Sequence, residues 1–320
     1  MKDSAVLLID CPDQKGLVAR VSSLLYRHGA NILHADQHQD HELGLFFMRV
    51  EWALDGAEGN PRNSEQKLCG TESHPNRKDK DAARVGHPAN GEASFDLKAF
   101  QAEFAPLAAE LKMNWKLTSG ERRPRVALFC SQYLHCMADL LYRWRAGELE
   151  CEIPLIVSNH REVETLAAFY GIPFEHIEVT AATRDAAEQR QFELLSRHEI
   201  ELVVLARYMQ ILSPGFIARY PAAIINVHHS FLPAFTGARP YHAAHARGVK
   251  LIGATSHYVT EVLDDGPIIE QDVARVSHRD QVEDLVARGR DLERMVLSRA
   301  VRWHLDRRIL CYGNKTVVFD

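Results

Sequence analysis

The sequence predicts an α/β protein in two parts, an N-terminal ferredoxin-like unit and a C-terminal α/β domain with a mostly parallel sheet. The N-terminal pattern runs β-α-β-β-α-β, which is the order of the ferredoxin-like arrangement. Further along, continuous apolar strands alternate with helices, as in a parallel sheet that is covered on both faces. A hydrophobic fraction of 46% and a charged fraction of 25% fit a globular chain of 320 residues.

The N-terminal unit is expected to span residues 1–118. Apolar residues recur at helical spacing after the turn "CPDQKG", and Gly29 then ends the helix. The second helix is expected in "FDLKAFQAEFAPLAAELKM", before a last strand "NWKLTS". The expected elements are a strand at Ser4–Asp10, a helix over 17–28, strands from Asn31 and at Leu43–Trp52, a helix over 95–113 and a strand at Asn114–Ser119.

Residues 55–94 interrupt this unit between its third strand and its second helix. They contain no aromatic residue and are rich in Gly, Pro, Asn and charged residues. Such a segment buries too little apolar surface to offset the entropy of ordering. We therefore expect a flexible surface insertion, with a regulatory or partner-binding arm as the alternative. After the unit, residues 119–124 ("SGERRP") are predicted to form the linker.

Residues 125–320 are predicted to form the second domain. The apolar runs "RVALFC", "IPLIVS", "ELVVLA" and "AIINVHH" are expected to be strands, each separated from the next by a helical pattern. The expected helices cover 136–149, 161–171 and 212–220, and a long final helix covers 281–302 before a short strand at 315–320.

Charge and cysteine usage restrict the partners and the compartment. A net charge of -5 argues against a general electrostatic grip on nucleic acid or on anionic lipid. The apolar run at the N-terminus is too short for a signal segment or a membrane span. The six cysteines are scattered without a C-x-x-C pair, so we expect reduced thiols, a cytoplasmic protein and no structural zinc site.

Several common motifs are absent from the sequence. No G-x-G-x-x-G follows "RVALFC", so a nicotinamide dinucleotide cofactor is unsupported, and no Walker loop, H-E-x-x-H or G-x-S-x-G motif occurs. His242 and His245 stand three residues apart on an expected helix, as metal ligands can. Because no carboxylate or cysteine accompanies them at ligand spacing, a solvated helix face is favoured, and no metal is predicted.

Polar residues gather where the strand "AIINVHH" ends. In open α/β sheets, ligands bind beyond the carboxyl ends of the strands. Asn226 and His228 stand at this end, and Asp264 lies further along in the turn "LDDGP". An amide, an imidazole and a carboxylate that converge on one carbonyl can perform acyl-group chemistry. Taken singly, His228 is more often a core histidine, and Asn226 and Asp264 are ordinary loop and turn residues.

The stretch from Asn226 through "LDDGPIIEQD" resembles the folate-dependent formyltransferase family, whose signature is Asn-x-His followed downstream by Asp in an L-D-x-G-P turn. Asn226, His228 and Asp264 occupy the three signature positions. The resemblance covers nearly the whole chain. It implies an N-terminal ACT domain followed by a Rossmann-like formyltransferase domain, with 10-formyltetrahydrofolate as the substrate and no cofactor. The insertion at residues 55–94 departs from the family pattern.

Two details favour the hydrolases of this family, which release formate and tetrahydrofolate and so supply formate for purine synthesis and balance the folate pool. Transferases of the family carry a glycine-rich, phosphate-binding loop after the first strand, where this chain has "CSQYLHC". They also commonly have His-Pro-Ser where this chain has His-His-Ser. The alternatives are transfer of the formyl group to an amine, and an amino-acid sensor whose second domain is silent.

The resemblance also implies roles for further residues. The stretch "RYMQILS" would line the pterin pocket, with backbone groups of Met209, Gln210, Ile211 and Leu212 reading the ring edge. His257 would support Asp264 or a catalytic water, and a strand-packing histidine is the alternative. In this mechanism Asp264 accepts a proton from water, so we expect burial and Asp265 to raise its pKa above the usual value of about 3.9.

An ACT-like domain implies regulation. Such domains usually pair edge to edge and bind an amino acid near the turn after the first strand. The matching residues are Asp13, Gln14, Lys15 and Gly16, which we name as a possible effector site. We therefore expect a homo-oligomer that responds to an amino acid such as glycine or methionine. A domain used only for assembly is the alternative, because fold does not fix function.

Overall fold

The computed structural model describes residues 4–54, 95–120, 122–233 and 240–319. The chain forms two compact units, and the division between them falls between Glu121 and Arg122. The domain boundaries drawn from the sequence stay a prediction, and the predicted insertion at residues 55–94 lies outside the described residues.

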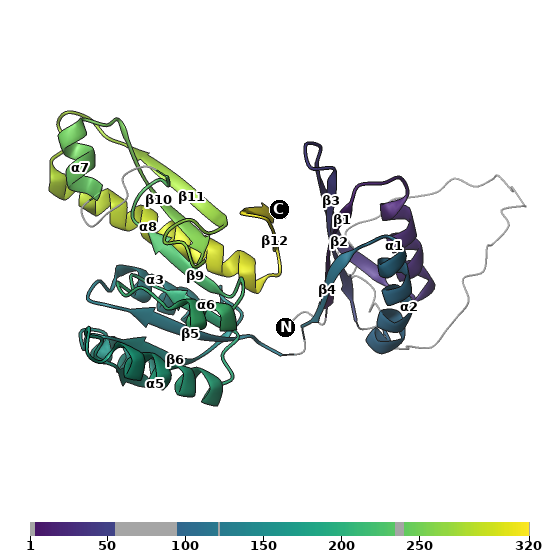
Figure 1. Ribbon diagram of the computed structural model, residues 1–320, viewed down its shortest axis with the longest axis horizontal. Coiled ribbons are helices and arrows are strands. Elements are labelled where there is room, and N and C mark those ends of the chain that lie inside the picture. The colour runs from purple at the N-terminus through teal and green to yellow at the C-terminus, as the bar shows by residue number, and fades with distance from the viewer. Residues whose placement is uncertain (1–3, 55–94, 121, 234–239, 320) are drawn as a thin grey trace, which may run out of the picture. The chain divides into compact units, whose positions relative to one another are not determined.

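The first unit has the predicted β-α-β-β-α-β order. Its four strands lie in the order β2-β3-β1-β4, and β1 is antiparallel to both β3 and β4. Both helices lie on one face of this sheet (Figure 1). The elements are β1 (Ser4–Pro12), α1 (Leu17–Arg27), β2 (Asn31–Asp40), β3 (Leu45–Ala53), α2 (Leu97–Glu110) and β4 (Asn114–Ser119).

Local sequence explains where these helices begin and end. Gly16 has φ 90, a left-handed conformation that turns the chain from β1 into α1. Asp96 caps α2, because its side chain accepts hydrogen bonds from the backbone N–H groups of Lys98 and Ala99. Inside the unit, aromatic rings pack between the helices and the sheet, among them Trp52, Phe100, Phe104 and Trp115.

The second unit is a mostly parallel sheet covered by helices, which confirms the predicted fold class. Its strands lie in the order β11-β10-β9-β8-β5-β6-β7. Neighbours from β9 to β7 are parallel, whereas β10 is antiparallel to both β9 and β11. The strands are β5 (Arg125–Cys130), β6 (Glu152–Ser158), β7 (Phe174–His176), β8 (Leu202–Leu205), β9 (Ile224–His228), β10 (Leu251–Tyr258) and β11 (Ile268–Arg275).

Helices cover both faces of this sheet. One face packs against α3, α4, α7 and α8, and the other against α5 and α6, which gives two separate apolar clusters. A small hairpin of β12 and β13 follows α8. The bounds are α3 (His135–Arg145), α4 (Glu164–Tyr170), α5 (Arg184–Arg197), α6 (Pro214–Arg219), α7 (Pro240–Arg247), α8 (Val282–Leu305), β12 (Ile309–Tyr312) and β13 (Lys315–Val318).

The sequence patterns did not predict every element. Helix α5 was not predicted, because its residues are largely polar and charged and only five of them are buried, including Gln191. The three-residue strand β7 is too short to show a period, and the antiparallel strands β10 and β11 were not placed in the sheet. The other parallel strands were predicted. The omission matters mainly at β10, because this strand carries His257.

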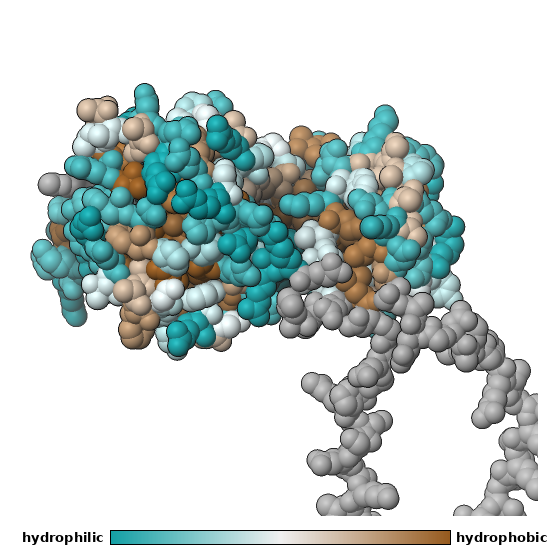
Figure 2. Space-filling view, turned by 90° about the horizontal axis from the view of Figure 1, so that it is seen from below, coloured by the Kyte–Doolittle hydropathy of each residue, from teal (hydrophilic) through white to brown (hydrophobic). Residues whose placement is uncertain are grey.

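Within the described ranges, no helix is both long enough and apolar enough to cross a bilayer. Figure 2 shows a face on which hydrophilic residues predominate and hydrophobic residues form smaller patches.

Candidate active site

Strand β9 carries the first two residues of the predicted signature. Asn226 and His228 are two positions apart on β9, so their side chains leave the same face of the strand. On one side, Asn226 is opposite Leu205 at the end of the parallel strand β8. On the other, it is opposite His257 of the antiparallel strand β10. The site therefore lies where the carboxyl ends of β8 and β9 meet the end of β10.

The turn after β10 brings Asp264 to His228. Asp264 Oδ2 lies 3.2 Å from His228 Nδ1. Asp264 has φ 56, in the left-handed region, and the next residue but one packs tightly on β10. A Cβ at Gly266 would lie 1.8 Å from the carbonyl oxygen of Tyr258, so only glycine allows this close approach. The "LDDGP" motif thus holds the carboxylate over the strand end.

Hydrogen bonds settle the orientation of His257. Its Nδ1 lies 2.9 Å from the carbonyl oxygen of Tyr258, an acceptor, so Nδ1 carries the proton. Its Nε2 therefore accepts from Asn226 Nδ2 at 3.3 Å. Burial lowers the pKa of His257, which keeps the ring neutral. His257 Nε2 is 3.8 Å from Asp264 Oδ1. The geometry thus links His257 to the amide of Asn226 more closely than to the carboxylate.

The expected rise in the pKa of Asp264 is wrong. The hydrogen bond from His228 stabilises the carboxylate and lowers the pKa of Asp264, while burial acts in the opposite direction and is outweighed. The expected rise was based on burial and on the neighbouring Asp265. Asp265 is exposed, however, and is not among the causes of the pKa shift. Asp264 is therefore an anion at neutral pH.

His228 has one ring nitrogen without a protein partner. The side chain is buried, and among the described residues Nε2 makes no hydrogen bond. A buried polar atom without a partner is costly unless a ligand supplies the missing bond. With Nδ1 paired to Asp264, an imidazolium at this position points an N–H group at that ligand. The amide of Asn226 provides a second donor nearby, so the three predicted residues form a two-donor, one-carboxylate arrangement.

The loop after β8 contains the residues predicted to bind folate. Met209 and Ile211 are exposed, Gln210 is half-buried and Leu212 is buried. The N–H group of Met209 donates to Ser131 Oγ at 3.0 Å, and the carbonyl oxygen of Ile211 accepts from Arg184 at 2.6 Å. Two of the backbone groups in this loop are thus already occupied, and its role in binding stays a prediction.

Sequence reasoning missed a buried network beside the signature. His229 Nδ1 lies 2.6 Å from Arg207 Nη1, and Arg207 Nε lies 3.4 Å from Glu293 Oε2 on α8. Glu293 also accepts from His135 Nε2 and from Tyr241 Oη, both at 2.8 Å. The doubled histidine in "NVHHS" was the visible signal, whereas the partners are far away in sequence.

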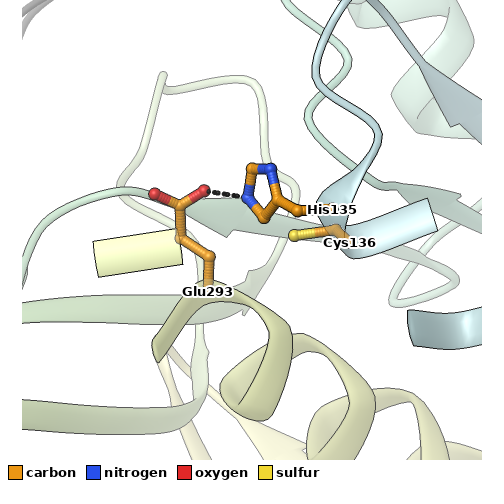
Figure 3. Close-up of side chains that lie close together, drawn as sticks. All are labelled: His135, Cys136 and Glu293. Atoms are coloured by element: carbon orange, nitrogen blue, oxygen red, sulfur yellow. Dashed lines mark hydrogen bonds and ion pairs between the residues drawn. The ribbon is translucent and has the colours of Figure 1, made fainter. Parts of the chain in front are cut away.

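Part of this network has the composition of a metal site. His135, Cys136 and Glu293 offer ligand atoms within 4.8 Å of one another, and Figure 3 shows the hydrogen bond between the imidazole and the carboxylate. The carboxylate, however, already faces the guanidinium of Arg207, a permanent cation. Burial also raises the pKa of Cys136 far above its ordinary value, so the thiol is protonated. An internal ion pair explains this cluster better than a bound cation does.

The remaining predicted residues belong to other elements of the fold. Asp13, Gln14, Lys15 and Gly16 form an exposed turn in the first unit, where Asp13 accepts a hydrogen bond from Gln39. His242 and His245 are exposed on α7, as expected of a solvated helix face. Every cysteine in the described part of the chain is a free thiol. The effector role of the turn stays a prediction.

Two family models match the chain. The model described as "Formyl transferase" matches residues 124–301, and the one described as "ACT domain" matches residues 5–55. The first of these covers the strands, the loops and the three signature residues of the site.

Full-length relatives give a narrower placement. The chain is 48% identical to a formyltetrahydrofolate deformylase of Synechocystis sp., over 99% of this chain and 98% of the relative, and 44% identical to one of Bacillus subtilis, over 100% and 95%. Its structure is similar to that of a deformylase from Pseudomonas syringae, with a TM-score of 0.85, 43% identity and coverage of 100% and 95%. A glycinamide ribonucleotide transformylase from Symbiobacterium toebii matches with a TM-score of 0.59 and 28% identity, over 64% of this chain and 98% of its own.

This chain therefore belongs to the formyltetrahydrofolate deformylase family, as shown by its ACT and formyl transferase parts, its signature residues and its full-length similarity to deformylases.

Proposed function

We propose that this chain hydrolyses 10-formyltetrahydrofolate to tetrahydrofolate and formate at the site formed by Asn226, His228 and Asp264. The observation that carries the proposal is the Nε2 of buried His228, which has no hydrogen-bond partner among the described residues and is set beside an ionised Asp264 and the oriented amide of Asn226. Full-length similarity to deformylases supports the choice of substrate.

In the proposed reaction, the two donors bind the formyl oxygen. Asn226 uses the amide hydrogen that it does not share with His257, and His228 uses Nε2–H. Water attacks the formyl carbon, and Asp264 orients it and accepts its proton. The resulting oxyanion is stabilised by both donors. The C–N10 bond then breaks, N10 takes the proton that Asp264 had accepted, and formic acid loses its own proton to solvent, so formate and tetrahydrofolate leave and Asp264 is an anion again.

A carboxylate with a lowered pKa is a weak base in the resting site. His228 is the largest cause of the lowered pKa of Asp264, however, and the effect of His228 on this carboxylate changes during the reaction. As negative charge develops on the formyl oxygen, it neutralises the cation of His228, so the proton affinity of Asp264 rises when water must be deprotonated. Before that point, the ionised carboxylate orients the water.

The loop at Met209–Leu212 would contact the pterin ring in this proposal, since it follows β8 beside Asn226. Folate is the substrate, and hydrolysis moves no electrons between molecules, so the mechanism draws on no redox cofactor. The first unit would pair in a homo-oligomer and bind an amino-acid effector at Asp13–Gly16. A cytoplasmic location belongs to the same proposal.

Incubation of the purified protein with 10-formyltetrahydrofolate alone tests the function. We expect tetrahydrofolate and formate in equal amounts, because water is the acceptor. The rival reaction, transfer to an amine, requires that acceptor. Formate that appears only after an amine is added, or a formylated amine in its place, would favour the transferase alternative, and folate binding without turnover would favour a silent domain.

Replacing any of the three signature residues should abolish most turnover without unfolding the protein. We expect Asn226→Ala and His228→Ala each to lower kcat by roughly a hundred- to a thousandfold, as removal of one oxyanion donor typically does. We expect Asp264→Ala to lower kcat by roughly a hundred- to ten-thousandfold, as removal of a general base typically does. Formate release and circular dichroism, measured on the same preparations, check this. A folded Asp264→Ala protein with near-wild-type turnover would refute its assignment.

His257 should act by orienting the amide of Asn226. His257→Gln keeps an acceptor near the position of Nε2, whereas His257→Leu removes it. We expect the leucine variant to lose about tenfold or more in kcat with little change in KM, and the glutamine variant to retain most of it. If both variants lose activity equally, His257 supports packing and not the amide.

The effector proposal is tested by calorimetry with glycine and with methionine. We expect one of them to bind and to change the rate of formate release, and Asp13→Ala to weaken that response while basal activity persists. If neither amino acid gives heat or alters activity, the ACT unit serves assembly alone.

A further inference from the structure

A buried chain of charges connects helix α8 with the histidine that follows His228. Glu293 is only 2% exposed, yet three donors or cations face its carboxylate: Tyr241, His135 and Arg207. Burial acts to raise the pKa of Glu293, but the hydrogen bond from His135 and the charge of Arg207 lower it overall. Glu293 is therefore the anion that compensates the buried guanidinium.

The other end of Arg207 fixes the proton of His229. A guanidinium only donates, so His229 Nδ1, 2.6 Å from Arg207 Nη1, must present its lone pair, and the proton of His229 is on Nε2. Burial lowers the pKa of His229 to about 4, with further lowering by the charges of Arg207 and His228. His229 thus stays neutral at the pH values where an imidazole normally titrates.

We propose that Arg207 and Glu293 are positioning residues that direct the single positive charge of the His228–His229 pair to His228. The two rings lie 5.1 Å apart, so two imidazolium cations there would repel each other. Arg207 opposes protonation of His229. Glu293 offsets the charge of Arg207, so that the guanidinium does not also oppose protonation of His228. The inference rests on the proposed hydrolysis, in which the His228 cation binds the oxyanion.

The remaining charged neighbours do not duplicate this role. Asp264 Oδ2 lies 3.2 Å from His228 Nδ1, and His257 on β10 stays neutral because burial lowers its pKa. Around Glu293, burial raises the pKa values of Tyr241 and Cys136, so neither takes up charge at neutral pH. Within the described ranges, the titratable and charged groups around the pair and its network include Asp264, His257, Arg207, Glu293, His135, Tyr241, Tyr133, Cys136, Asp139 and Arg294.

The test is the pH dependence of kcat for formate release in four proteins: wild type, Glu293→Gln, Arg207→Met and the double variant. Activity requires protonated His228, so it falls as the pH rises through the basic limb. Glu293→Gln leaves Arg207 uncompensated, which disfavours the cation, and the basic limb should move to lower pH by about one unit. Arg207→Met leaves Glu293 uncompensated and frees His229 Nδ1, so the limb should move to higher pH while the maximal kcat falls.

Charge compensation predicts that the double variant returns the basic limb to within about half a unit of wild type. If the two residues had only a structural role, both single variants would shift the basic limb in the same direction, and the double variant would show a larger shift than either. Glu283→Gln and Arg302→Met, at exposed positions of the same helix α8, are matched controls and should leave the profile unchanged. Shifts of both single variants in the same direction, or no shift in either, would overturn the proposal.

A second measurement reads the wild-type protein directly and does not depend on activity; a variant is used only to assign signals. With ¹⁵N-labelled histidine in the wild-type protein, His229 should show the neutral Nε2–H form from pH 5 to 8, with its signals assigned through His229→Gln. Detection of the Nδ1–H form or of an imidazolium in this range would refute the inference. Wild-type formate release without an amine, in the same assay, tests the proposed function separately, so either claim can fail alone.

Discussion

The contact between His228 and Asp264 is the constraint on which the site depends. An imidazole and a carboxylate 3.2 Å apart, both largely shielded from water, stabilise each other's charged forms. Each comes from a different element: His228 is the last residue of β9, and Asp264 belongs to the turn after β10. The pair therefore exists only while β9 and β10 stay in register and the turn packs down on Tyr258, which the absence of a side chain at Gly266 permits.

This pair also determines how the chemistry is divided. Because His228 is the main cause of the lowered pKa of Asp264, the charge state of this carboxylate depends on its contact with His228. A site that needs both an oxyanion donor and a base obtains both from this one pair. The amide of Asn226 adds a donor whose orientation is fixed by neutral His257, so the arrangement needs little reorganisation when substrate arrives.

The sequence predicted the fold class and the three signature residues, and physical reasons explain the limits of that prediction. Apolar runs such as "RVALFC" and "ELVVLA" have the period and length of buried strands. The first run is β5, and the second contains the whole of β8. The pKa of Asp264 was predicted in the wrong direction because sequence proximity to Asp265 was visible while spatial proximity to His228 was not. Arg207, His135 and Glu293 could not be linked from the sequence, since they are 72 or more positions apart or on separate elements.

The site and its buried network share an unusual feature of the backbone, a positive φ at a residue that is not glycine. Asp264 and Arg207 are not glycines, yet both have positive φ values, 56 and 65. A residue in such a region costs on the order of 1–3 kcal/mol, and it persists only when the surrounding structure determines it. In both cases the unusual backbone directs a charged side chain toward a histidine, Asp264 toward His228 and Arg207 toward His229. The two neighbouring imidazoles thus have different partners: an anion contacts His228, whereas a cation donates to His229 and opposes its protonation. That asymmetry gives the doubled histidine two distinct chemical roles, which an identical environment on both sides would not provide.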